Sequence, residues 1–210
     1  MRFDVAAHAG GERVVLGEWG EKLRRELLAE VRQLAEGDTV EISFAGVQIV
    51  STLTISEFLV SMLDARRDGR PHVGVVVTDA DEDQRDVIVK CLEFSSTSVA
   101  PLLVACQMED GELTLLGKVD ATTRRTWDVV RRLGEFRATD LAAALGVTPQ
   151  LANNRLARLT RVGALVRRPT VASSGVREFV YRLPSPSPRS AKAKHRQPRT
   201  ATPAGSRGDS

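Results

Sequence analysis

Apolar residues recur at two different periods along the first half of the chain. Between residues 21 and 35 they fall three or four positions apart, which predicts an amphipathic helix. Residues 39–47 alternate between apolar and polar, and 72–79 form a continuous apolar run typical of a strand buried on both faces. The same reading predicts helices at 54–67 and 81–94 and strands at 2–9, 12–17, 99–107 and 111–117, the first two joined at Gly10 and Gly11. Strands that alternate with helices predict an α/β (α+β) fold class.

A different pattern begins near residue 119. Residues 122–133 place Trp127, Val130 and Leu133 on one helical face, and Gly134 ends that helix. A shorter helix is predicted at 138–145, with Thr139 or Asp140 able to cap it.

Gly146 then permits a tight turn into a third helix. Thr148 caps that helix and Pro149 occupies its first position, where no amide hydrogen is needed. The helix buries a stripe made of Ala152, Leu156, Leu159 and Val162. Two helices joined by such a turn predict a helix-turn-helix.

Two predicted strands follow the third helix, Leu165–Arg168 and Arg177–Leu183, on either side of a tip at Ser173, Ser174 and Gly175. They complete a winged helix. Beyond residue 183 no apolar side chain is larger than Ala, so residues 184–210 are predicted to be a disordered basic tail. The predicted domains are therefore 1–118, 119–183 and 184–210.

The net charge of +3 conceals a strong asymmetry between these parts. Residues 1–118 hold 12 Lys and Arg against 21 Asp and Glu, whereas residues 119–183 hold 12 against 5 and residues 184–210 hold 6 against 1. A basic second half predicts a polyanionic partner for that half alone. The tail either adds sequence-independent DNA affinity or only increases solubility.

Several classes of protein do not fit the sequence. No apolar run approaches the roughly 20 residues that a bilayer requires, and no signal-peptide pattern is present, so we expect a cytoplasmic protein without membrane contact. Cys91 and Cys106 lie in apolar segments and are expected to be buried free thiols. His8, His72 and His195 have no partner at metal-ligand spacing. We expect no metal, no cofactor and no enzyme activity.

The first domain resembles a known family over roughly residues 13–95. The segment VEISFAGVQIVSTLTISEFLVSML is similar to the STAS-like domain of prokaryotic proteins of unknown function, which it matches at Phe44, Gly46, Val47, Ser51 and Glu57. Ser43 stands where an Asp is usual. The resemblance implies a small α/β sandwich related to anti-sigma-factor antagonists, in which the serine at the helix start is phosphorylated. The alternative is that Ser51 acts only as a helix N-cap.

The second domain has the stronger resemblance, over about residues 122–183. The segment DLAAALGVTPQLANNRLARLTRVGALVRR closely resembles the winged helix-turn-helix of bacterial transcriptional regulators. Its third helix then acts as a recognition helix, whose N-terminal half enters the major groove of double-stranded DNA. The residues expected to read bases are Gln150, Leu151, Asn153, Asn154 and Arg155, and those expected to contact phosphates are Thr148, Arg158, Arg167, Arg168 and Arg177.

The sequence thus predicts a DNA-binding transcriptional regulator whose STAS-like domain serves for sensing or for homodimerisation. The resemblance also implies a regulatory protein partner for that domain. The alternative is a partner-switching or defence-system protein whose winged helix contacts protein rather than DNA.

Overall fold

The computed structural model of the protein describes residues 1–65, 73–96, 101–171 and 177–185. In chain order its elements are β1 (Arg2–Asp4), α1 (Val5–His8), β2 (Val14–Val15), η1 (Gly17–Trp19), α2 (Gly20–Val31), β3 (Thr39–Ser43), β4 (Ile49–Val50), α3 (Thr52–Ile55), η2 (Ser56–Val60), α4 (Ser61–Ala65), β5 (Gly74–Thr78), α5 (Glu82–Ser95), β6 (Leu103–Gln107), β7 (Leu113–Gly117), α6 (Ala121–Leu133), β8 (Phe136–Arg137), α7 (Ala138–Leu145), α8 (Pro149–Arg161), β9 (Val166–Val171) and β10 (Arg177–Arg182). We call residues 1–118 the N-terminal part and residues 119–183 the C-terminal module.

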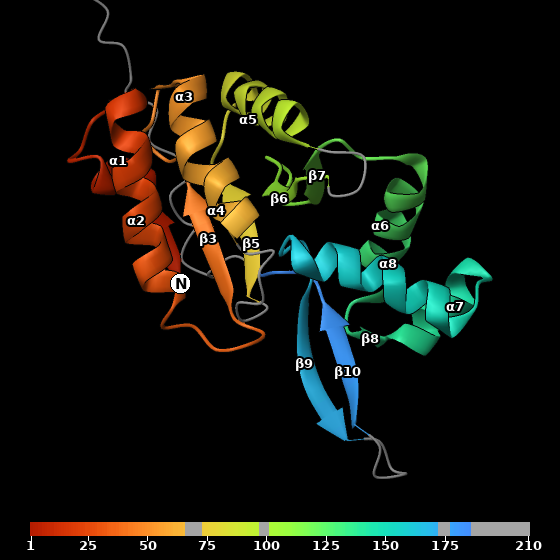
Figure 1. Ribbon diagram of the computed structural model, residues 1–210. Coiled ribbons are helices and arrows are strands. Elements are labelled where there is room, and N and C mark those ends of the chain that lie inside the picture. Colours follow the sequence, from red (N-terminus) through yellow and green to blue (C-terminus); the bar gives the residue numbers. More distant parts are fainter. Residues whose placement is uncertain (66–72, 97–100, 172–176, 186–210) are drawn as a thin grey trace, which may run out of the picture.

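The N-terminal part is built on a five-stranded sheet in the order β1-β3-β5-β6-β7. The first four strands are parallel to their neighbours, and β7 closes the sheet antiparallel to β6. Strand β5 is buried along its whole length at the centre, as its apolar run predicts. Helices α2, α3 to α4 and α5 pack with the sheet into the first core (Figure 1). The predicted α/β class is confirmed at this level.

The predicted hairpin at the N-terminus is wrong. The chain leaves the strand after Asp4, because the Asp4 carboxylate accepts a hydrogen bond from the Ala7 N–H at 3.0 Å and starts the short helix α1. Strand β1 pairs with β3, and β2 pairs in parallel with β4. Both partners lie far along the chain, so the local pattern did not reveal them.

The predicted helices are present, and α3, η2 and α4 together replace the single one predicted at 54–67. Ser51 caps α3, since its hydroxyl accepts from the Thr54 N–H at 3.1 Å. The predicted caps of α7 are wrong: its N-cap is Arg137, and the Asp140 carboxylate accepts from the Arg137 N–H at 2.7 Å from inside the first turn.

The C-terminal module combines helices α6, α7 and α8 with a three-stranded antiparallel sheet in the order β8-β10-β9 (Figure 1). Its core includes Trp127, Leu141 and Leu156, together with Leu103 and Ala105 of strand β6. The second core therefore extends into the N-terminal part. The predicted boundary at residue 118 remains a prediction, and the predicted tip at 173–175 and most of the tail lie outside the described residues.

The turn between α2 and β3 forms a second contact between the two parts. The Arg182 guanidinium donates to the Gly37 carbonyl at 3.2 Å, and the Arg167 guanidinium meets the Glu36 carboxylate at 2.8 Å. Gly37 has a φ of +90°, and a Cβ built on it would lie 2.7 Å from the Cγ of Arg168. Only glycine combines this backbone conformation with so close an approach.

We expect Gly37→Ala to destabilise the protein more than Gly111→Ala does. Gly111 has a φ of +87° but nothing lies within 4 Å of its added Cβ, so its alanine variant bears the backbone strain alone, about 1–2 kcal/mol. Gly37→Ala adds a steric conflict of about 1–3 kcal/mol at the contact between the two parts. Chemical denaturation of both variants measures the difference. Equal losses in the free energy of unfolding would mean that the Arg168 side chain moves aside from residue 37 at no cost.

Candidate nucleic-acid interface

Local signals fix where the helices of the C-terminal module begin and end. Helix α7 ends at Gly146, which adopts the left-handed conformation at φ 67° and ψ 40°. The Thr148 hydroxyl then accepts from the Leu151 N–H at 3.3 Å and caps α8, with Pro149 at its first position. These predicted features are confirmed.

Helix α8 buries the predicted stripe and exposes its opposite face. Ala152, Leu156, Leu159 and Val162 are each at most 5% exposed. The predicted base-reading side chains lie on the outer side of the first turns, where Gln150, Leu151, Asn153 and Asn154 are exposed and Arg155 is half-buried. The structure thus brings the five residues together on one surface.

The amides on this surface have no role in holding the helix. Within the described residues, no intramolecular hydrogen bond engages the side chains of Gln150, Asn153 or Asn154. The Arg155 side chain also buries its Nε without a hydrogen-bond partner there. Asparagine has a lower helix propensity than alanine, so two adjacent exposed asparagines reduce the stability of α8. No hydrogen bond of their side chains within the described residues offsets this loss. The hydrogen-bond donors and acceptors of these amide side chains are therefore available to an external partner.

Two of the predicted phosphate contacts are engaged inside the molecule. The Arg158 guanidinium lies 2.8 Å from the carboxylate of Asp120, the N-cap of α6. The Arg167 guanidinium pairs with Glu36 and lies over the ring of Phe179, 4.3 Å from its centroid. Both cations are already neutralised by these carboxylates.

The other predicted phosphate contacts are more accessible. Arg168 on β9 and Arg177 at the start of β10 are exposed, and Thr148 is exposed although its hydroxyl serves the helix cap. Sequence reasoning missed Arg161, which is exposed on α8 two turns after Asn154. A spacing of seven residues returns to the same helix face, and that spacing was a signal available in the sequence.

A second basic surface lies on α6. A hollow of about 450 Å³ between α6 and α7 is lined by Arg124, Arg125 and Arg132, together with the carboxylate of Asp128. The Arg132 Nε donates to the Asp128 backbone carbonyl at 3.0 Å. Sequence reasoning assigned these arginines no role.

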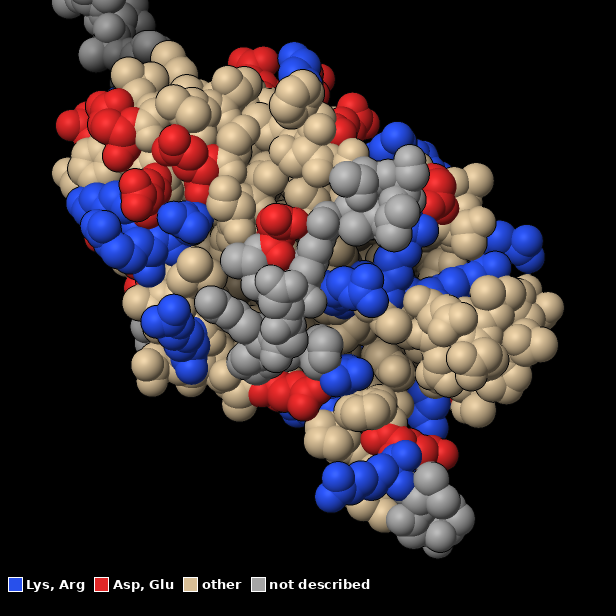
Figure 2. Space-filling view, in the orientation of Figure 1, with Lys and Arg blue, Asp and Glu red and all other residues tan. Residues whose placement is uncertain are grey.

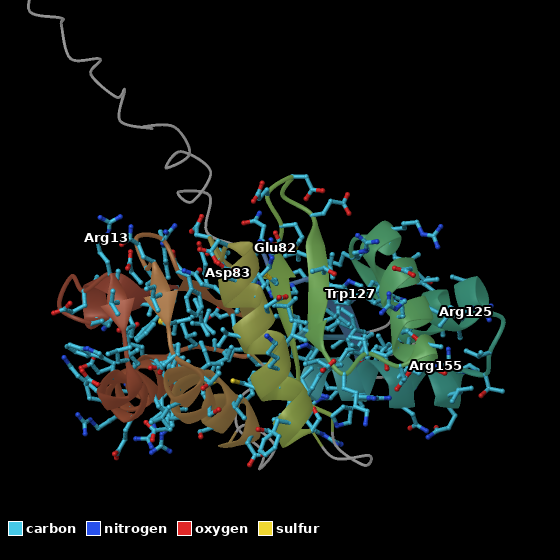
Figure 3. All side chains as sticks on the ribbon, turned by 90° about the horizontal axis from the view of Figure 1, so that it is seen from above. Arg13, Glu82, Asp83, Arg125, Trp127 and Arg155 are labelled. Atoms are coloured by element: carbon cyan, nitrogen blue, oxygen red, sulfur yellow. The ribbon has the colours of Figure 1, made fainter. Side chains whose placement is uncertain are left out.

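The charges are distributed unevenly over the molecule. Figure 2 shows Lys and Arg side chains over the region of α8 and along the hairpin formed by β9 and β10, while acidic side chains gather over α1. In Figure 3 both Arg125 and Arg155 lie at the end of the molecule formed by the C-terminal module. A surface of this kind favours a polyanion.

The other candidate groups do not form a site. Ser51 is half-buried and its hydroxyl also lies 2.9 Å from that of Thr54. Cys91 and Cys106 are buried free thiols, as predicted, and burial raises the pKa of the Cys106 thiol to about 11 although Arg85 lowers it. His8 stacks on Phe3, whereas His72 and His195 lie outside the described residues. Among the described residues, no cluster of three or more His, Cys, Asp or Glu is suited to a metal ion.

Comparison with known proteins gave no matching family model, no similar curated protein and no similar solved structure. In the described part of the chain, no helix has the length and apolar character needed to cross a membrane.

The Asp120 carboxylate provides a test of how α6 and α8 are held together. Its hydrogen bond from the Thr123 N–H and the nearby Arg158 guanidinium lower the pKa of Asp120. We expect Asp120→Ala to lower the free energy of unfolding by about 0.5–2 kcal/mol through the lost N-cap. Asp120→Asn keeps a good cap and removes only the charge, so its loss should be smaller.

The pH dependence follows from the lowered pKa. The charge contributes stability that is fully present above the pKa of the unfolded state, about 3.9, and is lost as the pH falls through the lower pKa of the folded state. The difference in the free energy of unfolding between wild type and Asp120→Asn should therefore be constant near neutral pH and should disappear at acidic pH. Urea denaturation at several pH values measures it, and a gap that widened in acid would contradict this assignment.

Proposed function

We propose that the protein is a DNA-binding transcriptional regulator and that α8 is its recognition helix. The observation that carries the proposal is the row of unbonded amides on the exposed first turns of α8. Asn and Gln can make paired hydrogen bonds to adenine and Arg to guanine, whereas the leucine at position 151, 42% exposed, can contact a thymine methyl group.

The arrangement of the C-terminal module supports this proposal. Three helices and a three-stranded sheet in the order β8-β10-β9 agree with the winged helix that the sequence resembles, in which the hairpin of β9 and β10 would be the wing. Arg161, Arg168 and Arg177 are exposed on α8 and on that hairpin, where phosphate contacts would fix the register of the helix on the duplex.

We infer further that the N-terminal part is a STAS-like domain with a sensing or dimerising role. Its parallel sheet with helices packed into one core, and Ser51 at the start of α3, agree with the resemblance in the sequence. The first experiment is a gel-shift titration of the full chain against genomic DNA fragments at several salt concentrations. Absence of any shift at low salt would contradict DNA binding.

We expect Asn154→Ala to alter sequence preference without unfolding the protein. Loss of a paired base contact should cost about 1–3 kcal/mol on the preferred site and relax discrimination at one base pair. Selection from a random DNA pool followed by binding titrations measures both effects. Gln33→Ala, an exposed amide in the N-terminal part, is the matched control and should change neither. An unchanged preference in the Asn154 variant would show that α8 does not read bases there.

Two arginines separate phosphate contact from internal pairing. Arg177→Ala should weaken binding to all sequences and reduce the slope of log K against log salt by about one unit. Arg167→Ala should leave that slope unchanged, because Glu36 already neutralises its guanidinium. Affinities at four or more salt concentrations measure both slopes. Equal reductions in the two variants would mean that Arg167 leaves Glu36 to bind DNA.

A further inference from the structure

A group of exposed apolar side chains lies at the β2–β4 ribbon. Val14, Leu16, Ile49 and Leu53 are 41%, 45%, 57% and 55% exposed. Val14 and Ile49 are register partners on one face of the ribbon, and the Leu53 side chain lies directly over the backbone of Gly17. The four residues therefore form one continuous surface, which we call the ribbon patch. Contiguous exposed apolar surfaces mark interaction sites more often than isolated apolar residues do.

Opposite charges flank the ribbon patch. On one side is Arg13, whose carbonyl accepts from the Ile49 N–H at 3.1 Å and so lies beside β4. On the other side is the first turn of α5, which carries Glu82 and Asp83. The Gln84 side chain in the same turn connects α5 to the segment that leads into β4. The Gln84 amide does so by donating to the Val47 carbonyl, two residues before β4, at 2.9 Å.

These charges have no partner within the described residues. Arg13, Glu82 and Asp83 are exposed and form no ion pair there. Figure 3 shows Arg13 and the acidic pair well apart along one side of the N-terminal part. The surface thus has an apolar centre between a positive and a negative border.

We propose that a second copy of this chain covers the ribbon patch. In a two-fold symmetric dimer the same surface faces itself, so each border residue meets the opposite border of the partner. Arg13 of each copy then lies against Glu82 and Asp83 of the other, around an apolar centre. A surface that carries both signs of charge on opposite sides is complementary to itself, whereas an unrelated partner would need no such symmetry.

The position of the patch is compatible with the proposed DNA contact. In Figure 1 the start of α3 lies at the end of the molecule opposite the hairpin of β9 and β10. A dimer formed at the ribbon patch leaves α8 and the hairpin uncovered in both copies. The dimer proposal goes beyond DNA binding, and its test uses no DNA. A negative result for the dimer therefore does not contradict DNA binding, and a negative result for DNA binding does not contradict the dimer.

The first test is the oligomeric state of the full chain by sedimentation equilibrium. The wild type should be a dimer at tens of micromolar, and Ile49→Lys should raise its dissociation constant at least about 100-fold by placing a charge in the apolar centre. Phe94→Lys is the matched control, because Phe94 is 93% exposed at the far end of α5 and should leave the dimer intact. A monomeric wild type, or equal effects of the two lysines, would overturn the proposal.

Charge reversal tests the pairing across the two-fold axis. Arg13→Glu should weaken the dimer about ten-fold through like-charge contact with Glu82 and Asp83, as should the double change Glu82→Arg and Asp83→Arg. The combined triple variant restores opposite signs and should return to within about three-fold of the wild type. We expect all these variants to fold, because the three positions are exposed, and thermal melts verify this. A triple variant weaker than either reversal alone would refute the proposed pairing.

Discussion

Strand β6 is buried on both faces, and the relation between the two parts of the molecule depends on this. Its residues alternate between two cores: Val104 and Cys106 belong to the first, Leu103 and Ala105 to the second. Both faces of one strand are thereby excluded from water, an arrangement usual for parallel strands covered on each side. Helices of the N-terminal part cover one face, and the C-terminal module covers the other.

The C-terminal module packs on the second face of the sheet near β6 because the polarity of that face changes across the sheet. The register aligns Glu41, Val76, Ala105 and Leu115 in one row on the second face. At the β3 end of the row, Glu41 is 1% exposed and pairs with Arg2 at 3.3 Å, so that end needs polar neighbours. At the β6–β7 end the row is apolar. The C-terminal module buries this apolar end, where Leu103, Ala105 and Leu115 join the second core.

Further contacts fix the orientation of the module on this apolar end. The Val75 N–H donates to the Gly163 carbonyl at 2.8 Å, directly after α8, and the Arg167–Glu36 pair joins β9 to the turn before β3. The end of α8 and the start of the hairpin are therefore both attached to the N-terminal part. The N-terminal part thus holds α8 and the hairpin through β5 and through the α2–β3 turn.

The parts that the sequence predicted well are those governed by local signals. The cap at Thr148, the turn at Gly146 and the buried stripe through Leu156 act within a few residues, and all three are present. The N-terminal hairpin was predicted wrongly because strand pairing is set by distant partners, β3 and β4. The exposed amides were likewise predicted from α8 alone.

The arginines show the same limit at the proposed site. Arg158 and Arg167 carry the charge and the position expected of phosphate contacts, but each has a carboxylate partner 38 or 131 residues away along the chain, a separation visible only in the fold. Part of the excess positive charge of the C-terminal module is therefore used to hold the molecule together. Exposed arginines that form no ion pair within the described residues include Arg161, Arg168 and Arg177 on α8 and the hairpin, and Arg124 and Arg125 on α6. Because the N-terminal part carries the excess of Asp and Glu, it repels a polyanion. The two effects together make the C-terminal module, with α6, α8 and the hairpin, the part of the molecule that repels a polyanion least.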